Sequence, residues 1–203
     1  MTTSTAQERP RTALSRLGTP WLCLAALLGG FVAAAALTGL LPADLRIPVG
    51  EWGALAVFLA GAIPLAVVDA RTTRLPNRGT YPLAMAACGY WVGIALTTGT
   101  WSKLIQAIAC AVVIFLIAFV IGMIGTLALG DIKLMLSIGL LTGWISWLLP
   151  VYALVAAYIL AVPHALALIA RKRKTGTSTV LPFGPYLVTA TTAVVIAAIA
   201  ATH

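Results

Sequence analysis

Long, unbroken runs of apolar residues make up most of the chain, and short polar stretches rich in Arg and Lys separate them. A helix that crosses a bilayer needs about 20 predominantly apolar residues, whereas a strand of a membrane barrel alternates apolar and polar positions over about 10 residues. The unbroken runs therefore predict membrane-spanning helices. We predict seven spans, approximately Pro20–Leu41, Trp52–Val68, Thr80–Thr98, Leu104–Gly125, Ile132–Leu149, Val151–Ala170 and Phe183–Ala201.

Composition supports this fold class. Hydrophobic residues make up 61% of the 203 positions and charged residues only 9%, whereas about a quarter of the residues of a soluble domain are charged. We therefore expect an all-α, polytopic transmembrane helical bundle that forms one domain over residues 20–203. Residues 1–19 are expected to form a disordered polar tail.

The first apolar run has a second interpretation. The basic stretch from Arg9 to Arg16 and the alanines Ala33–Ala36 also fit the charged region and the cleavage site of a signal peptide. The run is long for a signal peptide, so we favour a retained helix. Cleavage would leave the topology of the later spans unchanged.

The basic residues predict the orientation, because the cytoplasmic loops of membrane proteins carry an excess of Lys and Arg. If the spans alternate in direction, Arg46 and Lys103 fall on one side and the other eleven of the thirteen basic residues fall on the opposite side. These eleven are Arg9, Arg11, Arg16, Arg71, Arg74, Arg78, Lys133, Arg171, Lys172, Arg173 and Lys174. We therefore place the N-terminus in the cytoplasm and the spans in a bacterial inner membrane. Orientation and contacts with anionic lipid explain the net charge of +8 without a nucleic-acid partner.

The chain has only five acidic residues. Glu8 lies in the polar tail, and Asp44 and Glu51 flank the predicted outer loop, where we expect them to be solvated. Asp69 and Asp131 differ because each adjoins an apolar run. A carboxylate beside hydrocarbon is costly and tends to be functional.

Span counting puts Asp69 and Asp131 on the same side of the membrane. Each could simply pair with a nearby base, Asp69 with Arg71 or Arg74 and Asp131 with Lys133. They could also face each other within a compact bundle. Two carboxylates in contact share a proton, because both cannot ionise readily. An aspartic protease uses that state, in which one carboxylate accepts a proton from water while the other polarises the scissile carbonyl.

Three short motifs surround these positions. Asp69 is followed by Leu75-Pro76-Asn77, Asp131 lies in Gly130-Asp131-Ile132-Lys133, and Pro182-Phe183-Gly184-Pro185 precedes the last span. In this order and at predicted cytoplasmic span ends, they resemble the motifs of the type IV prepilin peptidase family. The resemblance covers roughly Gly53 to the C-terminus and implies a six-helix peptidase core preceded by an N-terminal helix. It implies that Asp69 and Asp131 are the catalytic pair.

The remaining motif residues have readable physical roles. Pro76 ends helical structure and Asn77 suits a turn or an N-cap for the third span. Gly130 lets substrate or a partner helix approach Asp131 closely. Lys133 could steady the ionised pair or extend to lipid headgroups. The segment Pro182, Phe183, Gly184 and Pro185 could pair with an extended substrate or simply start the last helix.

The family implies a prepilin or pseudopilin substrate, with a basic cytoplasmic leader, a glycine before the scissile bond and then an apolar helix. The first glycine of the family's G-x-G-D motif is Ala128 here, a small-for-small change that we expect the site to tolerate. Longer members carry a cytoplasmic insertion with paired C-x-x-C motifs, associated with N-methylation. Cys23, Cys88 and Cys110 lie far apart in apolar runs. We therefore expect a peptidase-only form, and the sequence gives no evidence of a metal or a cofactor.

Two alternatives stay open at this point. A small cation- or proton-coupled transporter could use the same aspartates, although transporters more often place such groups near the midplane and show internal repeats. A non-catalytic scaffold of a secretion machine could retain the fold. His164, in the sixth predicted span, is expected to be a packed or interfacial residue.

Overall fold

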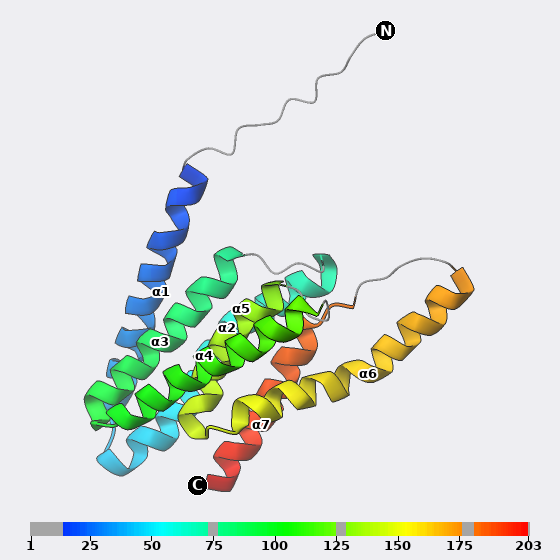
Figure 1. Cartoon of the computed structure of the whole chain (residues 1–203). Helices are drawn as coiled ribbons and strands as arrows, with labels where there is room; N and C mark the ends of the chain where they lie inside the picture. Colours follow the sequence, from blue (N-terminus) through cyan, green and yellow to red (C-terminus); the bar gives the residue numbers. More distant parts are fainter. Residues whose placement is uncertain (1–13, 73–76, 125–128, 176–180, 203) are drawn as a thin grey trace.

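The computed structural model describes residues 14–72, 77–124, 129–175 and 181–202. These residues form seven helices (Figure 1). They are α1 (Leu14–Gly39), α2 (Ala43–Thr72), α3 (Asn77–Thr98), α4 (Trp101–Met123), α5 (Leu129–Ile145), α6 (Leu149–Thr175) and α7 (Gly184–Thr202). The prediction of an all-α helical bundle is confirmed, and each predicted span corresponds to one helix.

The helices differ from the predicted spans mainly at their starts. Helix α1 begins at Leu14, so residues 14–19 are helical and do not belong to an irregular tail. Residues 1–13 of the predicted tail lie outside the described residues. Helix α2 begins at Ala43, well before the predicted start at Trp52. The segment around Glu51, predicted to be loop, is therefore helix.

Five helices are long and apolar enough to cross a membrane. Their candidate spans are Pro20–Gly39, Ala43–Thr72, Trp101–Met123, Leu149–Ala170 and Gly184–Thr202. Helices α3 and α5 are not among them, and α5 has only 17 residues. The chain is therefore a multi-pass membrane protein.

Successive helices run in alternating directions, which gives the bundle two ends (Figure 1). We call the end where α2 finishes and α7 starts the aspartate end, because Asp69 and Asp131 lie there. The opposite end, where α1 finishes and α4 starts, is called the glutamate end after Glu51.

Helices α3 and α5 form the centre of the bundle. Helix α5 is buried over most of its length, and Trp144 near its end stacks on Trp91 of α3 with ring centroids 4.2 Å apart. Helix α1 packs along α3, where a Cβ atom at Gly89 would collide with the backbone of Leu27. Small residues allow helices in membranes to approach in this way. Helix α6 crosses α7 and then diverges from the other helices (Figure 1).

Candidate active site

Asp69 lies in the last turn of α2 and is only 4% exposed. It continues the buried face of this helix, because Ala62, Leu65 and Asp69 follow one another at helical spacing and are all buried. Its Oδ2 atom accepts a hydrogen bond of 2.9 Å from the backbone N–H of Gly184. The carboxyl of Asp69 is therefore directed inward, toward the start of α7.

Gly184 is the first residue of α7, where backbone N–H groups have no partner within the helix. A Cβ atom at this position would lie 2.8 Å from Asp69 Oδ2 and 3.2 Å from Asp69 Cγ. Only glycine therefore allows the backbone to reach the carboxyl. The helix N-terminus also favours a negative charge at this point.

The structure joins two of the three sequence motifs through this contact. We predicted that the segment Pro182–Pro185 could pair with substrate or simply start the last helix, and no sequence pattern indicated that the Gly184 amide binds Asp69. Pro182 and Phe183 precede α7 in irregular conformation, and the carbonyl of Phe183 accepts hydrogen bonds from the N–H groups of Tyr186 and Leu187. Pro185 follows in the first turn, where the absence of an N–H has little cost.

Asp131 lies in the first turn of α5 and is 3% exposed. It is followed by Ile132, Leu134 and Met135, which are also buried, and it is preceded by Gly130, which is partly buried. Helices α2, α5 and α7 contact one another pairwise. Both aspartates are therefore buried at the same end of the bundle, on helices that touch.

Lys133 takes a direction that the sequence did not predict. Its Nζ atom lies 5.2 Å from the ring centroid of Tyr81 on α3, a distance at which a cation is attracted to the face of an aromatic ring. Positions two residues apart on a helix lie on nearly opposite faces. Lys133 and the buried Asp131 therefore point to different sides of α5.

The other predicted motif residues are only partly described. Asn77 is the first residue of α3, as expected for a residue that starts the third span. Pro76 and Ala128 lie outside the described residues, as does Arg74, one of the predicted partners of Asp69. Arg71, the other predicted partner, is exposed, whereas Asp69 is buried.

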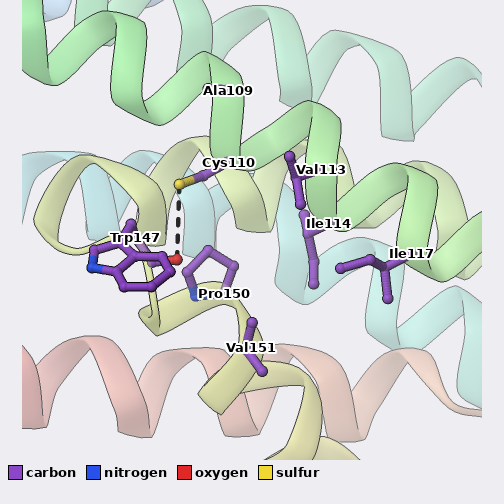
Figure 2. A pocket seen from close by; sticks show the side chains of 8 residues that line it. All are labelled: Ala109, Cys110, Val113, Ile114, Ile117, Trp147, Pro150 and Val151. Atoms are coloured by element: carbon purple, nitrogen blue, oxygen red, sulfur yellow. Dashed lines mark hydrogen bonds between the residues drawn. The ribbon is translucent and has the colours of Figure 1, made fainter.

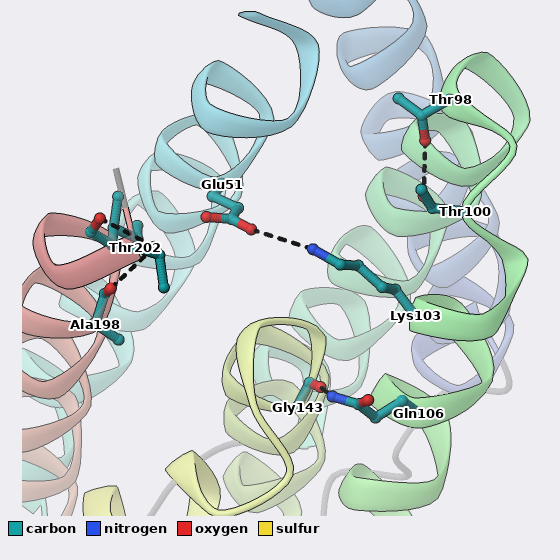
Figure 3. Close-up of polar contacts among 9 residues, drawn as sticks. Glu51, Thr98, Thr100, Lys103, Gln106, Gly143, Ala198 and Thr202 are labelled. Carbon is teal, nitrogen blue, oxygen red and sulfur yellow. Dashed lines mark hydrogen bonds and ion pairs between the residues drawn. The ribbon is translucent and has the colours of Figure 1, made fainter. Parts of the chain in front are cut away.

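Glu51 contradicts the expectation of a solvated residue. It lies within α2 and is only 4% exposed, and Lys103 Nζ on α4 is 3.9 Å from its Oε1 atom (Figure 3). Lys103 Nζ also lies 5.9 Å from the centroid of the Trp144 ring. The prediction was wrong because a basic residue from a distant part of the chain covers this carboxylate. Asp44, in contrast, is exposed in the first turn of α2, as expected.

The surface of the bundle has several depressions. A pocket of about 150 Å³ lies between α4 and the start of α6, beside Cys110 and Trp147 (Figure 2). Its lining is apolar apart from the Cys110 thiol, which donates to the carbonyl of Trp147 at 3.9 Å. A groove of about 260 Å³ runs between α2 and α7 and includes Ala70 and Pro185, the neighbours of Asp69 and Gly184. The groove therefore adjoins the aspartate end. A larger depression of about 480 Å³ between α2 and α3 also reaches this end, where Val68 and Gly79 line it.

Within the described ranges, no three His, Cys, Asp or Glu side chains gather in a way that could hold a metal ion. Cys23, Cys88 and Cys110 are free thiols. The groups placed for chemistry at the aspartate end are therefore carboxyls and backbone amides.

The fold and the site define a multi-pass helical membrane protein with two buried carboxylic acids at one end of the bundle. The family model described as the type IV leader peptidase family matches residues 56–166. The chain belongs to the type IV leader peptidase family, and the suspected relationship is thereby confirmed. The matched range includes Asp69 and Asp131 but ends before Pro182. Searches of curated proteins and of solved structures gave no significant match.

Proposed function

We propose that this protein is an aspartic endopeptidase that removes the basic leader from prepilins or pseudopilins, with Asp69 and Asp131 as the catalytic pair. The observation that carries the proposal is the burial of both carboxyls at one end of the bundle in a member of a leader peptidase family. The family favours a protease over a transporter.

In the proposed reaction the two carboxyls share one proton. The ionised group accepts a proton from water as the water attacks the scissile carbonyl, and the protonated group donates to the carbonyl oxygen. The Gly184 amide holds Oδ2 of Asp69, which leaves Oδ1 to face the water. The carboxyl that took the proton from water then gives it to the nitrogen, the C–N bond of the tetrahedral intermediate breaks, and the amine of the new N-terminus leaves. The other carboxyl recovers its proton from the hydroxyl of the intermediate as the new carboxylic acid forms, which restores the pair.

The proposed orientation puts the aspartate end in the cytoplasm of a bacterial cell, with the transmembrane peptidase domain over residues 20–203. The excess of Arg and Lys on that side supports it. A prepilin would then keep its basic leader in water and its apolar helix in lipid, so that the scissile bond lies level with Asp69 and Asp131. Membrane lipid surrounds the bundle as its second partner.

We assign the protein peptidase activity without N-methyltransferase activity. The segments between helices at the aspartate end are short, and the cysteines form no C-x-x-C pair. We assign site-shaping roles to Gly130, Pro76, Asn77 and the Pro182–Pro185 segment, and only a minor one to Lys133, whose ammonium lies over the Tyr81 ring.

The experiment is co-expression with a prepilin, with leader removal followed by gel shift. Asp69→Asn and Asp131→Asn should each abolish processing, because a neutral amide can neither accept nor donate the shared proton. Asp44→Asn is the matched control, since it makes the same change at an exposed position, and Arg71→Gln should also process normally. Processing by both aspartate variants would refute the proposal.

A further inference from the structure

The first turn of α7 determines where the Gly184 amide meets Asp69, so whatever holds this turn also holds the carboxyl. Helix α2 contacts it through the Gly184–Asp69 hydrogen bond itself. Helix α6 contacts the residues on either side of Gly184, and α2 and α5 also pack on α7.

Two contacts from α6 flank Gly184. On one side of it in the sequence, Phe183 is buried against the ring of Tyr158, with centroids 4.9 Å apart. On the other side, the hydroxyl of Tyr186 forms a short hydrogen bond with Nδ1 of His164. A histidine–tyrosine pair thus forms a polar link between α6 and the first turn of α7.

His164 is a polar residue within an apolar part of α6. It follows Pro163 inside an apolar helix, and Pro163 has no N–H to donate to the carbonyl one turn earlier. Polar side chains within a bilayer are costly unless they are hydrogen-bonded. Tyr186 supplies that hydrogen bond, so the pair is expected to form whenever α6 and α7 are packed as observed.

We propose that His164 and Tyr186 are positioning residues that fix the first turn of α7 and thereby hold the Gly184 amide on Asp69. This inference rests on the proposed role of Asp69 in catalysis. Neither residue touches the reacting atoms in this proposal, and both act through the backbone between Gly184 and Tyr186. Loss of the pair should lower the rate of the chemical step more than the affinity for substrate, because a small misplacement of a reacting group costs rate.

The test uses the full chain, purified in detergent, and a prepilin-like reporter with a basic leader, a glycine at the scissile bond and an apolar helix. Tyr186→Phe removes only the hydroxyl and should lower kcat about tenfold, with KM changed less than about twofold. His164→Ala should have a similar effect, and the double variant should be no slower than either single variant. His164→Asn, which can still offer a hydrogen-bonding group, should recover part of the rate.

Tyr152→Phe is the matched control, because Tyr152 is an exposed tyrosine of α6, and it should keep the full rate. Melting temperatures are measured for every variant. An unchanged kcat in Tyr186→Phe, multiplicative losses in the double variant, or a variant that is not recovered folded would each overturn the positioning role.

Asp69→Asn, assayed alongside, separates the two proposals. If it is inactive while Tyr186→Phe has the wild-type rate, the catalytic assignment stands and only the positioning role falls. If Asp69→Asn still cleaves the reporter, the proposed function itself is refuted and the positioning role falls with it.

Discussion

Both ends of the bundle bury carboxylic acids, but Glu51 at one end and Asp69 at the other are held in different ways. At the glutamate end, Glu51 lies 3.9 Å from the ammonium of Lys103. At the aspartate end, Asp69 is held by the neutral backbone amide of Gly184 at 2.9 Å. An ammonium brings a full positive charge to a carboxyl group, whereas an amide orients the group without adding a full charge. The difference agrees with a structural role for Glu51 and with the proposed chemical role of Asp69.

Hydrogen bonds between helices reinforce the glutamate end. The hydroxyl of Tyr90 on α3 donates to the carbonyl of Gly50 on α2 at 3.0 Å. Gln106 on α4 donates to the carbonyl of Gly143 in the last turn of α5 at 2.7 Å (Figure 3). Arg46 donates to the carbonyl of Thr97 at the end of α3, where a cation is favourable. This end therefore fixes the relative positions of the helices whose far ends carry the site.

After the substitutions of the two aspartates themselves, the largest effect is expected from Gly184→Ala, which would break the contact that holds Asp69. The added Cβ would lie 2.8 Å from Asp69 Oδ2, so the carboxyl or the start of α7 must move. We expect the rate of leader removal to fall by about a hundredfold. The control is Gly29→Ala, because a Cβ atom there would meet nothing within 4 Å. Equal rates for the two variants would show that the Gly184 contact does not matter.

An intermediate effect on stability, and none on chemistry, is expected from Lys103→Met. It leaves the carboxylate of Glu51 buried without its ammonium, at a cost of about 1–3 kcal/mol in the free energy of unfolding. Glu51→Leu combined with Lys103→Met should recover much of this loss. Thermal unfolding in detergent measures the loss, and the folded fraction should cleave at the wild-type rate. A selective loss of kcat would show that the glutamate end also takes part in catalysis.

The smallest effect is expected from Lys133→Met. The variant removes the attraction between the ammonium and the Tyr81 ring, which is worth about 0.5–1 kcal/mol at partly exposed sites. The rate of leader removal should change by less than about threefold. Lys133→Met and Tyr81→Leu should each lower the melting temperature by a similar small amount. The double variant should melt only slightly below either single variant. A loss of activity comparable to that of Asp131→Asn would instead place Lys133 at the catalytic pair.

Much of the fold could be predicted because an apolar run of membrane length admits few structures. Span counting was enough to place Asp69 and Asp131 at the same end. The hydrogen bond between Gly184 and Asp69 could not be predicted, because it joins positions 115 residues apart and depends on how α2 packs on α7. The burial of Glu51 was missed for the same reason, since the Lys103 side chain that lies over it comes from α4.

The central position of α3 and α5 has a consequence for how the chain enters the membrane during synthesis. The other helices are apolar and long enough to leave a translocon for lipid on their own. We expect α3 and α5 to be retained beside the translocon until neighbouring helices are available to cover them. Helix α5 carries Asp131, so the second carboxyl of the proposed catalytic pair would be delivered to the membrane already enclosed by protein. Assembly of the active pair would then be a late step of biogenesis, coupled to the insertion of helices that contribute nothing to the chemistry.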